Sequence, residues 1–203
     1  MYDTYPDTYQ KYFGQYGLKV ENVTRRVGVA ERGFFSLNNV LLNSDDKKSK
    51  LRSLPWAYRF WSAGYDTNVR EIETLHAIGR IDVFYKQANR KIGGFFIADY
   101  INSEFGVALL LDQHVNRPGH VPKTLAKAVK ALADQLNINN PQSWGDSEEA
   151  LLIEKYLALR TKTSMTHSQK RAETIRRKVE SGLISQKRHS FNAYVAESAN
   201  TPA

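Results

Sequence analysis

Residues 105–111, with the sequence FGVALLL, form the most apolar stretch of this chain. The run is short and does not alternate between apolar and polar positions, which favours a helix buried on all sides over a half-exposed strand. Asn102 or Ser103 can cap its first turn. We therefore expect a central helix over about residues 103–115. Such a helix has to be covered by other elements, so the chain is expected to fold as a globular domain around it.

Other segments have the period of helices that would pack against this centre. The recurring apolar positions in the two clearest segments are Ile72, Leu75, Ile78 and Ile81 within residues 67–86, and Leu125, Ala128, Val129, Leu132 and Leu136 after Pro122. Further helices are expected over residues 146–160 and, rich in basic side chains, from Gln169 to Ser181. Strand-like alternation is limited to a short element near Val20–Val29. The sequence therefore predicts a mainly α fold.

The chain divides into three expected parts. Residues 1–50 are a Tyr-rich N-terminal segment packed on the core, residues 51–188 are the helical domain, and residues 189–203 are an extended tail. With 203 residues, the chain is long enough to bury a core without disulfides or metals.

An aromatic cluster lies between Trp56 and Trp61, where WAYRFW places four aromatic side chains within six positions. A cluster of this density is typical of a hydrophobic core. The same side chains can also stack against sugar rings, so both interpretations stay open.

The formal net charge of +8 is concentrated near the C-terminal end. Residues 155–188 contain ten Lys and Arg residues against Glu173 and Glu180. This region is interpreted either as a solvated helix surface or as an attachment surface for an anionic cell wall or for nucleic acid. Aromatic residues are sparse there and no nucleic-acid-binding motif is present, which makes nucleic acid the less favoured partner.

Several classes of protein are excluded or disfavoured by what the sequence lacks. The absence of cysteine excludes a disulfide framework, a zinc ribbon, an iron–sulfur site and a thiol nucleophile. No apolar run approaches the roughly 20 residues that a membrane span requires, and no glycine-rich phosphate loop, HExxH helix or GxSxG elbow is present. We expect no cofactor and no membrane partner. The N-terminus MYDTYPDTYQ does not resemble a signal peptide, so we expect cytoplasmic synthesis followed by non-classical export or association with a particle.

The candidate site is the polar segment DQHVNRPGH at residues 112–120, which follows directly on the buried helix. A rigid element that ends in acidic, imidazole, amide and guanidinium groups is how functional sites are built. Its candidate residues are Asp112, His114, Asn116, Arg117 and His120, with Arg80 and Tyr85 from the preceding helix as further substrate-binding candidates. The alternative is structural, with Asp112 paired to Arg117 and Asn116 capping the turn. The two histidines are separated by a proline and lack helical i, i+4 spacing, so no metal site is expected.

An ordered set of motifs resembles a known family. The motifs are W-x-A-G-x-D-x-x-V-R-x-I-E at 61–73, I-x-S-E-F-G-x-A-L-L-L-D-Q-H-V-N-R-P-G at 101–119, A-L-L-I-E-K-Y-L-A-L-R at 150–160 and S-Q-K-R-A-x-x-I-R-x-x-V-x-x-G-L-I-S at 168–185. Together they are similar to the helical part of the lysozyme-like superfamily, close to chitosanase-type glycosidases and to bacterial and phage peptidoglycan hydrolases. The resemblance covers about residues 55–185. It implies hydrolysis of β-1,4 bonds in an amino-sugar polymer such as peptidoglycan or chitosan, by a general acid and a second carboxylate.

The chain departs from this family at its N-terminal end. Members carry the catalytic Glu on an N-terminal helix followed by a glycine-rich hairpin, whereas this chain begins YDTYPDTYQKYFGQYG. Glu21 and Glu31 are its only early glutamates, and the expected catalytic residues are Asp112 and Glu31. Three explanations remain: a fragment, a partner chain that supplies the acid, or a non-catalytic sugar-binding descendant. The alternative functions are a structural or interaction protein of a phage or other assembly, and nucleic-acid binding through residues 155–188.

Overall fold

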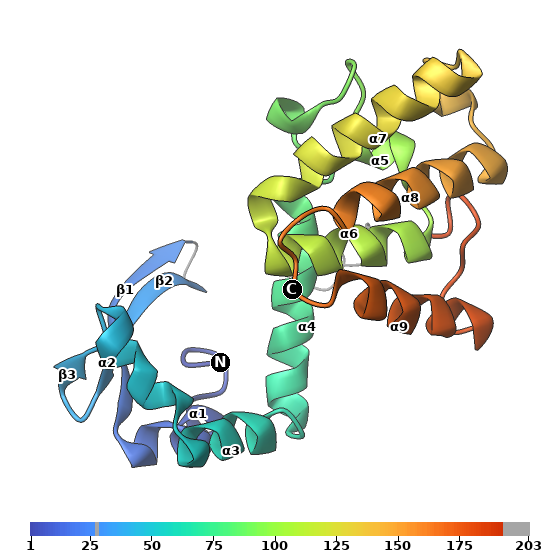
Figure 1. Ribbon diagram of the computed structural model, residues 1–203. Helices are drawn as coiled ribbons and strands as arrows, with labels where there is room; N and C mark the ends of the chain where they lie inside the picture. The colour runs from blue at the N-terminus through green and yellow to red at the C-terminus, as the bar shows by residue number, and fades with distance from the viewer. Residues whose placement is uncertain (27–28, 193–203) are drawn as a thin grey trace, which may run out of the picture. The chain divides into compact units, whose positions relative to one another are not determined.

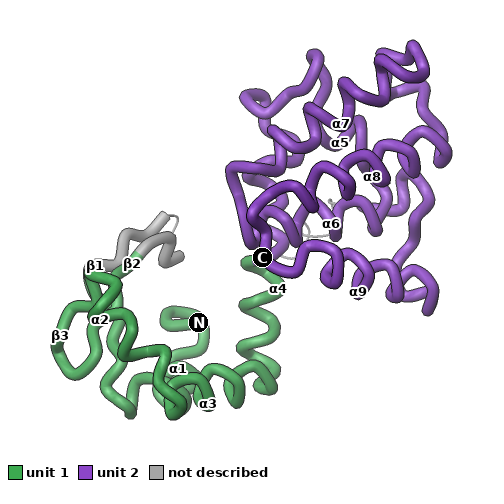
Figure 2. Tube along the Cα trace, viewed as in Figure 1, with its two compact units in different colours: residues 1–76 green, residues 77–203 purple. Residues whose placement is uncertain are grey.

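The computed structural model confirms a mainly α fold, with helices over 63% of the structure. It describes the backbone of residues 1–26 and 29–192, and the side chains of these residues outside 22–32. The chain forms two compact units, Met1–His76 and Ala77–Ala203 (Figures 1 and 2). The boundary between the two units lies between residues 76 and 77. From the sequence we expected the N-terminal part to end at residue 50.

The first unit combines short helices with an antiparallel sheet of order β1-β2-β3. Its elements are α1 (Pro6–Tyr12), β1 (Leu18–Arg26), β2 (Val29–Leu37), β3 (Val40–Leu41), α2 (Asp45–Ser49), α3 (Leu54–Ala63) and the first part of α4 (Thr67–Asp82). Pro6 opens α1 at a position where its missing N–H removes no helical bond. Ser44 caps α2 by accepting a hydrogen bond from the Lys47 backbone N–H.

The sheet is larger than the short strand expected near Val20–Val29. The strands β1, β2 and β3 pair with Leu18 opposite Leu37 and Leu37 opposite Val40. Asn38 and Asn39 connect β2 to β3 and both have positive φ values, of 49° and 65°. Two residues with positive φ make the tight turn that matches the twist of a hairpin, and asparagine tolerates this conformation. The Asn-Asn pair was therefore a turn signal that the hydrophobic pattern alone did not reveal.

The core of the first unit is small and partly aromatic. It consists of Tyr9, Phe13, Leu18, Leu42, Trp56, Ala63 and Val69. Trp56 is buried here, but Tyr58, Phe60 and Trp61 are exposed. The expectation that the aromatic cluster is core is therefore confirmed for one of its four members only. Burial of the Tyr9 phenol, which donates to the Leu18 carbonyl, raises its pKa to about 12.

The second unit is helical and is built around α6. Its elements are the last part of α4, α5 (Ile97–Tyr100), α6 (Glu104–Asn116), α7 (Val121–Leu136), α8 (Asp146–Arg160) and α9 (Ser168–Glu180). Figure 1 shows α6 among α7, α8 and α9. Leu109 and Leu110 are completely buried, and Ser103 caps the helix by accepting a hydrogen bond of 3.0 Å from the Gly106 N–H. The predicted central helix is confirmed.

Two expectations about α4 need correction. The helix predicted over residues 67–86 ends at Asp82, and Leu75 and Ile78 on its supposed core face are exposed. This helix runs from one compact unit into the other, so neither core covers its whole length.

Among the described residues, no helix is long and apolar enough to cross a membrane.

The C-terminal segment is also more ordered than the expected tail at residues 189–203. Phe191 N–H donates to the Asn102 carbonyl at 3.0 Å, and Ser190 Oγ accepts from the Glu104 N–H at 3.0 Å. The first N–H groups of a helix have no partner within it, and this segment supplies one at the start of α6. Residues 189–192 are therefore part of the packed unit, while residues 193–203 lie outside the described part of the chain.

Candidate functional site

Asp112, the expected catalytic residue, forms a clasp with two arginines from other helices. Its Oδ2 lies 2.6 Å from Arg160 Nη2, and its Oδ1 accepts from Arg171 Nε at 2.8 Å. The Arg160 side chain is 1% exposed and the Asp112 side chain 10%. Arg160 also donates to the carbonyls of Leu109 and Ser168, both at 3.1 Å. The clasp ties together α6, α8 and α9, and it occupies both carboxylate oxygens.

The other residues of the 112–120 segment do not converge on one site. Asn116 Nδ2 donates to the Asp112 carbonyl at 2.9 Å, and Arg117 pairs with Ser164 Oγ at 2.7 Å rather than with Asp112. His114 is buried and His120 is half-buried. The segment therefore ends α6 and starts the next turn, and its Asn116 and Arg117 side chains bond to neighbouring groups.

The remaining expected site residues have other roles or lie outside the described part. The buried Tyr85 hydroxyl donates to the Ile101 carbonyl at 2.8 Å. Glu21 accepts a hydrogen bond of 2.7 Å from the buried Ser36 hydroxyl across the hairpin. The side chain of Glu31 is outside the described residues. In the described ranges 1–26 and 29–192, no three His, Asp or Glu side chains group as a metal site.

His114 occupies an environment that disfavours its charged form. Its ring lies 4.8 Å from the Phe84 ring, and its Nδ1 atom is buried without a hydrogen-bond partner. Burial lowers the pKa of His114, and the positive charges of Arg80 and Arg90 lower it further. Arg80, an expected substrate-binding residue, thus acts on His114 through its charge.

We predict that this histidine makes the second unit less stable in acid. The unfolded chain binds a proton near the ordinary pKa of 6.5, whereas the folded chain binds it only at lower pH. At a pH between the pKa of His114 in the folded chain and its pKa in the unfolded chain, the unfolded chain binds more protons. The free energy of unfolding should therefore fall as pH drops from 7.5 to 5.5. Denaturant titrations at several pH values should show a smaller fall for His114→Gln. An equal fall in both proteins would contradict the assignment.

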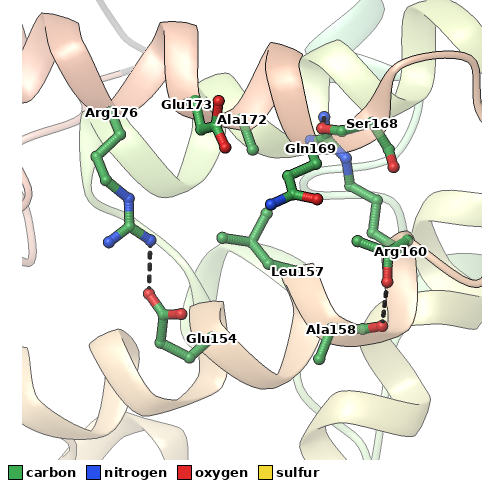
Figure 3. A pocket seen from close by; sticks show the side chains of 10 residues that line it. Glu154, Leu157, Ala158, Arg160, Ser168, Gln169, Ala172, Glu173 and Arg176 are labelled. Carbon is green, nitrogen blue, oxygen red and sulfur yellow. Dashed lines mark hydrogen bonds and ion pairs between the residues drawn. The ribbon is translucent and has the colours of Figure 1, made fainter.

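A groove runs between α8 and α9. It consists of two cavities of about 430 and 390 Å³ that share Glu154 and Arg176. Leu157, Ala158 and Ala172 line the first cavity together with the polar side chains of Ser168, Gln169 and Glu173 (Figure 3). Arg176 Nη2 lies 2.8 Å from Glu154 Oε1 and joins the two helices at the place where the cavities meet. Arg160 lines the same cavity, so the Asp112 clasp lies directly behind the groove.

Exposed aromatic side chains are concentrated in the first unit. Among the side chains that the structure describes, the large exposed aromatics are Tyr2, Tyr16, Phe34, Phe35, Tyr58, Phe60, Trp61 and Tyr65. All of these belong to residues 1–76, and the exposed large apolar side chains described in the second unit, which end at Leu183, are aliphatic. The two units therefore present surfaces of different chemistry.

Tyr58, Trp61 and Tyr65 form a continuous aromatic row along α3 and its C-terminal end. Their exposed fractions are 63%, 60% and 62%. The Tyr58 and Trp61 ring centroids are 5.8 Å apart, and those of Trp61 and Tyr65 are 4.9 Å apart. Arg70 fixes the end of the row, because its Nε donates to the Gly64 carbonyl at 3.0 Å while its guanidinium lies 5.7 Å from the Tyr65 ring. The spacing of three residues places Tyr58 and Trp61 on one face of α3, which is the signal present in the sequence, and Tyr65 continues the row from the turn after Ala63.

Comparisons with known proteins provide no relative for this chain. No family model matches it, no curated protein matches it, and no solved structure matches it. Its function has to be argued from its own residues.

Proposed function

We propose that this chain binds a cell-wall type polysaccharide, such as peptidoglycan or a chitosan-like polymer, through the aromatic row of Tyr58, Trp61 and Tyr65. The row is the single observation that carries the proposal. Three large rings kept in water cost solvation free energy, and contiguous exposed apolar patches mark interaction sites. Tyr and Trp rings offer an apolar face together with an O–H or N–H group. This combination suits a sugar ring, which has an apolar C–H face and a polar rim.

The environment of Asp112 supports binding without cleavage by this residue. A glycosidase needs a carboxylic acid that carries a proton to the leaving oxygen, which an apolar site without a cation favours. Asp112 instead has a guanidinium group on each oxygen. Both carboxylate oxygens of Asp112 are thus taken up by ion pairs with arginines, which leaves neither oxygen directed at a sugar.

The resemblance to lysozyme-like proteins supports the choice of ligand. The motif at residues 61–73 begins at Trp61, so one of the three rings is a residue of the motif, and Tyr65 lies within its span. Among the explanations for the unrecognised N-terminal acid, the non-catalytic sugar-binding descendant agrees best with an exposed row and an ion-paired Asp112.

The proposal is tested by sedimentation with insoluble peptidoglycan, chitin and chitosan, together with a reducing-end assay on each polymer. We expect retention on at least one amino-sugar polymer and no new reducing ends. Retention should persist in 0.5 M NaCl, since salt screens charge interactions but does not weaken the stacking of a sugar ring on an aromatic ring. Soluble oligosaccharides of the same polymer should release the protein. Absence of retention on all three polymers would overturn the proposal, and new reducing ends would overturn its non-catalytic part.

A further inference from the structure

The basic region at residues 155–188 has two populations of cations. Four of its ten Lys and Arg residues are arginines that form internal ion pairs: Arg160 and Arg171 with Asp112, Arg176 with Glu154, and Arg188 with Glu149. These pairs hold helices together. Fewer cations are therefore left to bind a partner than the sequence suggests.

The remaining cations of α9 lie on one side of the helix. Ala172, Ile175 and Val179 pack against the core of the second unit, and Glu173 and Arg176 line the groove toward α8. At about 100° per residue, Lys170 and Arg177 point within about 20° of each other, away from that core face, while Lys178 lies about 80° round the helix from Lys170. We name Lys170, Arg177 and Lys178 the outer stripe.

The outer stripe is exposed and uncompensated. All three side chains are exposed, and no acidic side chain in the described ranges is within ion-pair distance of them. Thr174 lies between Lys170 and Arg177, and Ser181 follows Lys178; their hydroxyls donate to the carbonyls of Lys170 and Lys178. No large apolar side chain interrupts the stripe, so it lacks what a helix needs to insert into a bilayer interface.

Helix stability explains only part of this pattern. Arg177 and Lys178 lie in the last turn, where positive charge is favourable to the helix dipole. Lys170 lies in the first turn, where positive charge is unfavourable, and no acidic residue accompanies it there. Lys170 and Arg177 are two turns apart, or about 10.5 Å along the axis. A ligand with several negative charges along its length would compensate both ends of the stripe at once.

We propose that the outer stripe of α9 binds a linear chain of phosphate groups. The side chains of the stripe would contact the phosphates of the polymer and no other part of it. The stripe is rich in lysine and contains no aromatic side chain, so it offers point charges to phosphates and no stacking platform for bases. This surface is independent of the aromatic row, which belongs to the other unit. Two sources share the required chemistry, the backbone of a nucleic acid and a phosphate-linked wall polymer.

The test measures binding of the full chain to inorganic polyphosphate and to duplex DNA at 50–200 mM salt. We expect binding to polyphosphate, with a logarithmic salt slope of about −3 on duplex DNA for three contacted phosphates. Lys170→Gln with Arg177→Gln and Lys178→Gln should weaken binding by about 10-fold or more at low salt and bring the slope close to zero. Equal binding of both ligands would identify any phosphate chain as the partner, whereas much tighter binding of DNA would identify nucleic acid.

The matched control replaces Lys123, Lys127 and Lys130 on α7 with glutamine. It removes the same charge over a similar length of helix, but Lys130 is already paired with Asp134 at 3.2 Å. We expect this variant to bind within about 3-fold of the unmodified chain. Three results would overturn the proposal: no binding of polyphosphate at 50 mM salt, equal losses in both triple variants, or binding to anionic lipid vesicles without binding to polyphosphate.

Discussion

Replacing Arg188 with alanine is expected to lower the free energy of unfolding by about 3–5 kcal/mol, because the change leaves a buried charge without its partner. The Arg188 side chain is 5% exposed and its Nη1 atom lies 2.8 Å from Glu149 Oε2, where Glu149 is 1% exposed. The same guanidinium donates to the carbonyls of Tyr100, Asp99 and Pro141 at 3.0, 3.0 and 3.3 Å. One side chain thus satisfies four acceptors contributed by α5, α8 and the segment that connects α7 to α8.

Glu149 makes this pair important for the centre of the second unit. Its Oε1 atom accepts hydrogen bonds from the N–H groups of Asn102 and Ser103, at 3.1 and 2.9 Å, just before α6 begins. Urea unfolding followed by far-UV circular dichroism measures the effect. Lys187→Ala is the control, since its side chain is exposed next to Arg188 and its loss should cost no more than about 0.5 kcal/mol. A loss below about 1 kcal/mol for Arg188→Ala would show that the pair is not structurally important.

Asp112→Ala is expected to cost a similar amount, about 3–5 kcal/mol. The change leaves the Arg160 guanidinium buried with only backbone carbonyls as partners. It also releases Arg171, and with it one connection between α6 and α9. This prediction distinguishes a structural Asp112 from a catalytic one, because removal of a catalytic carboxylate often leaves stability unchanged or raises it.

The same unfolding experiment on Asp134→Ala provides the comparison. Asp134 pairs with Lys130 on the surface of α7, with both side chains largely exposed, and such pairs contribute about 0–1 kcal/mol. If Asp112→Ala unfolds at the same denaturant concentration as Asp134→Ala, the clasp does not hold the helices together and a catalytic role for Asp112 regains support.

The parts of the fold that sequence reasoning predicted depend on local patterns. The run at 105–111 and the Ser103 cap define α6, and the repeating apolar positions after Pro122 define α7. Both signals come from residues a few positions apart, whose geometry the helix itself determines. The hairpin at 18–41 carried a weaker signal, because Phe34 and Phe35 are adjacent in β2 and both are exposed, so its apolar residues do not alternate.

The candidate site was less predictable because its contacts are long-range. Sequence proximity suggested Arg117 as the partner of Asp112, whereas the actual partners, Arg160 and Arg171, are 48 and 59 residues away. The aromatic row had a similar ambiguity. A helix face with rings three residues apart, as at Tyr58 and Trp61, is core if another element covers it and surface if none does, and only the packing of the first unit decides between them.

The most direct test of the central claim removes the aromatic row without changing the charge. The variant Tyr58→Ala, Trp61→Ala and Tyr65→Ala replaces exposed side chains, so its circular dichroism spectrum should match that of the unmodified chain. The control is Phe34→Ala with Phe35→Ala, which removes two exposed rings from the same unit but outside the row. Sedimentation with the polysaccharide that retains the unmodified chain is then measured for both. We predict that the row variant loses at least about 10-fold in affinity, equivalent to 1.4 kcal/mol, while the control stays within about 2-fold. Equal retention of the row variant and the unmodified chain would contradict the account.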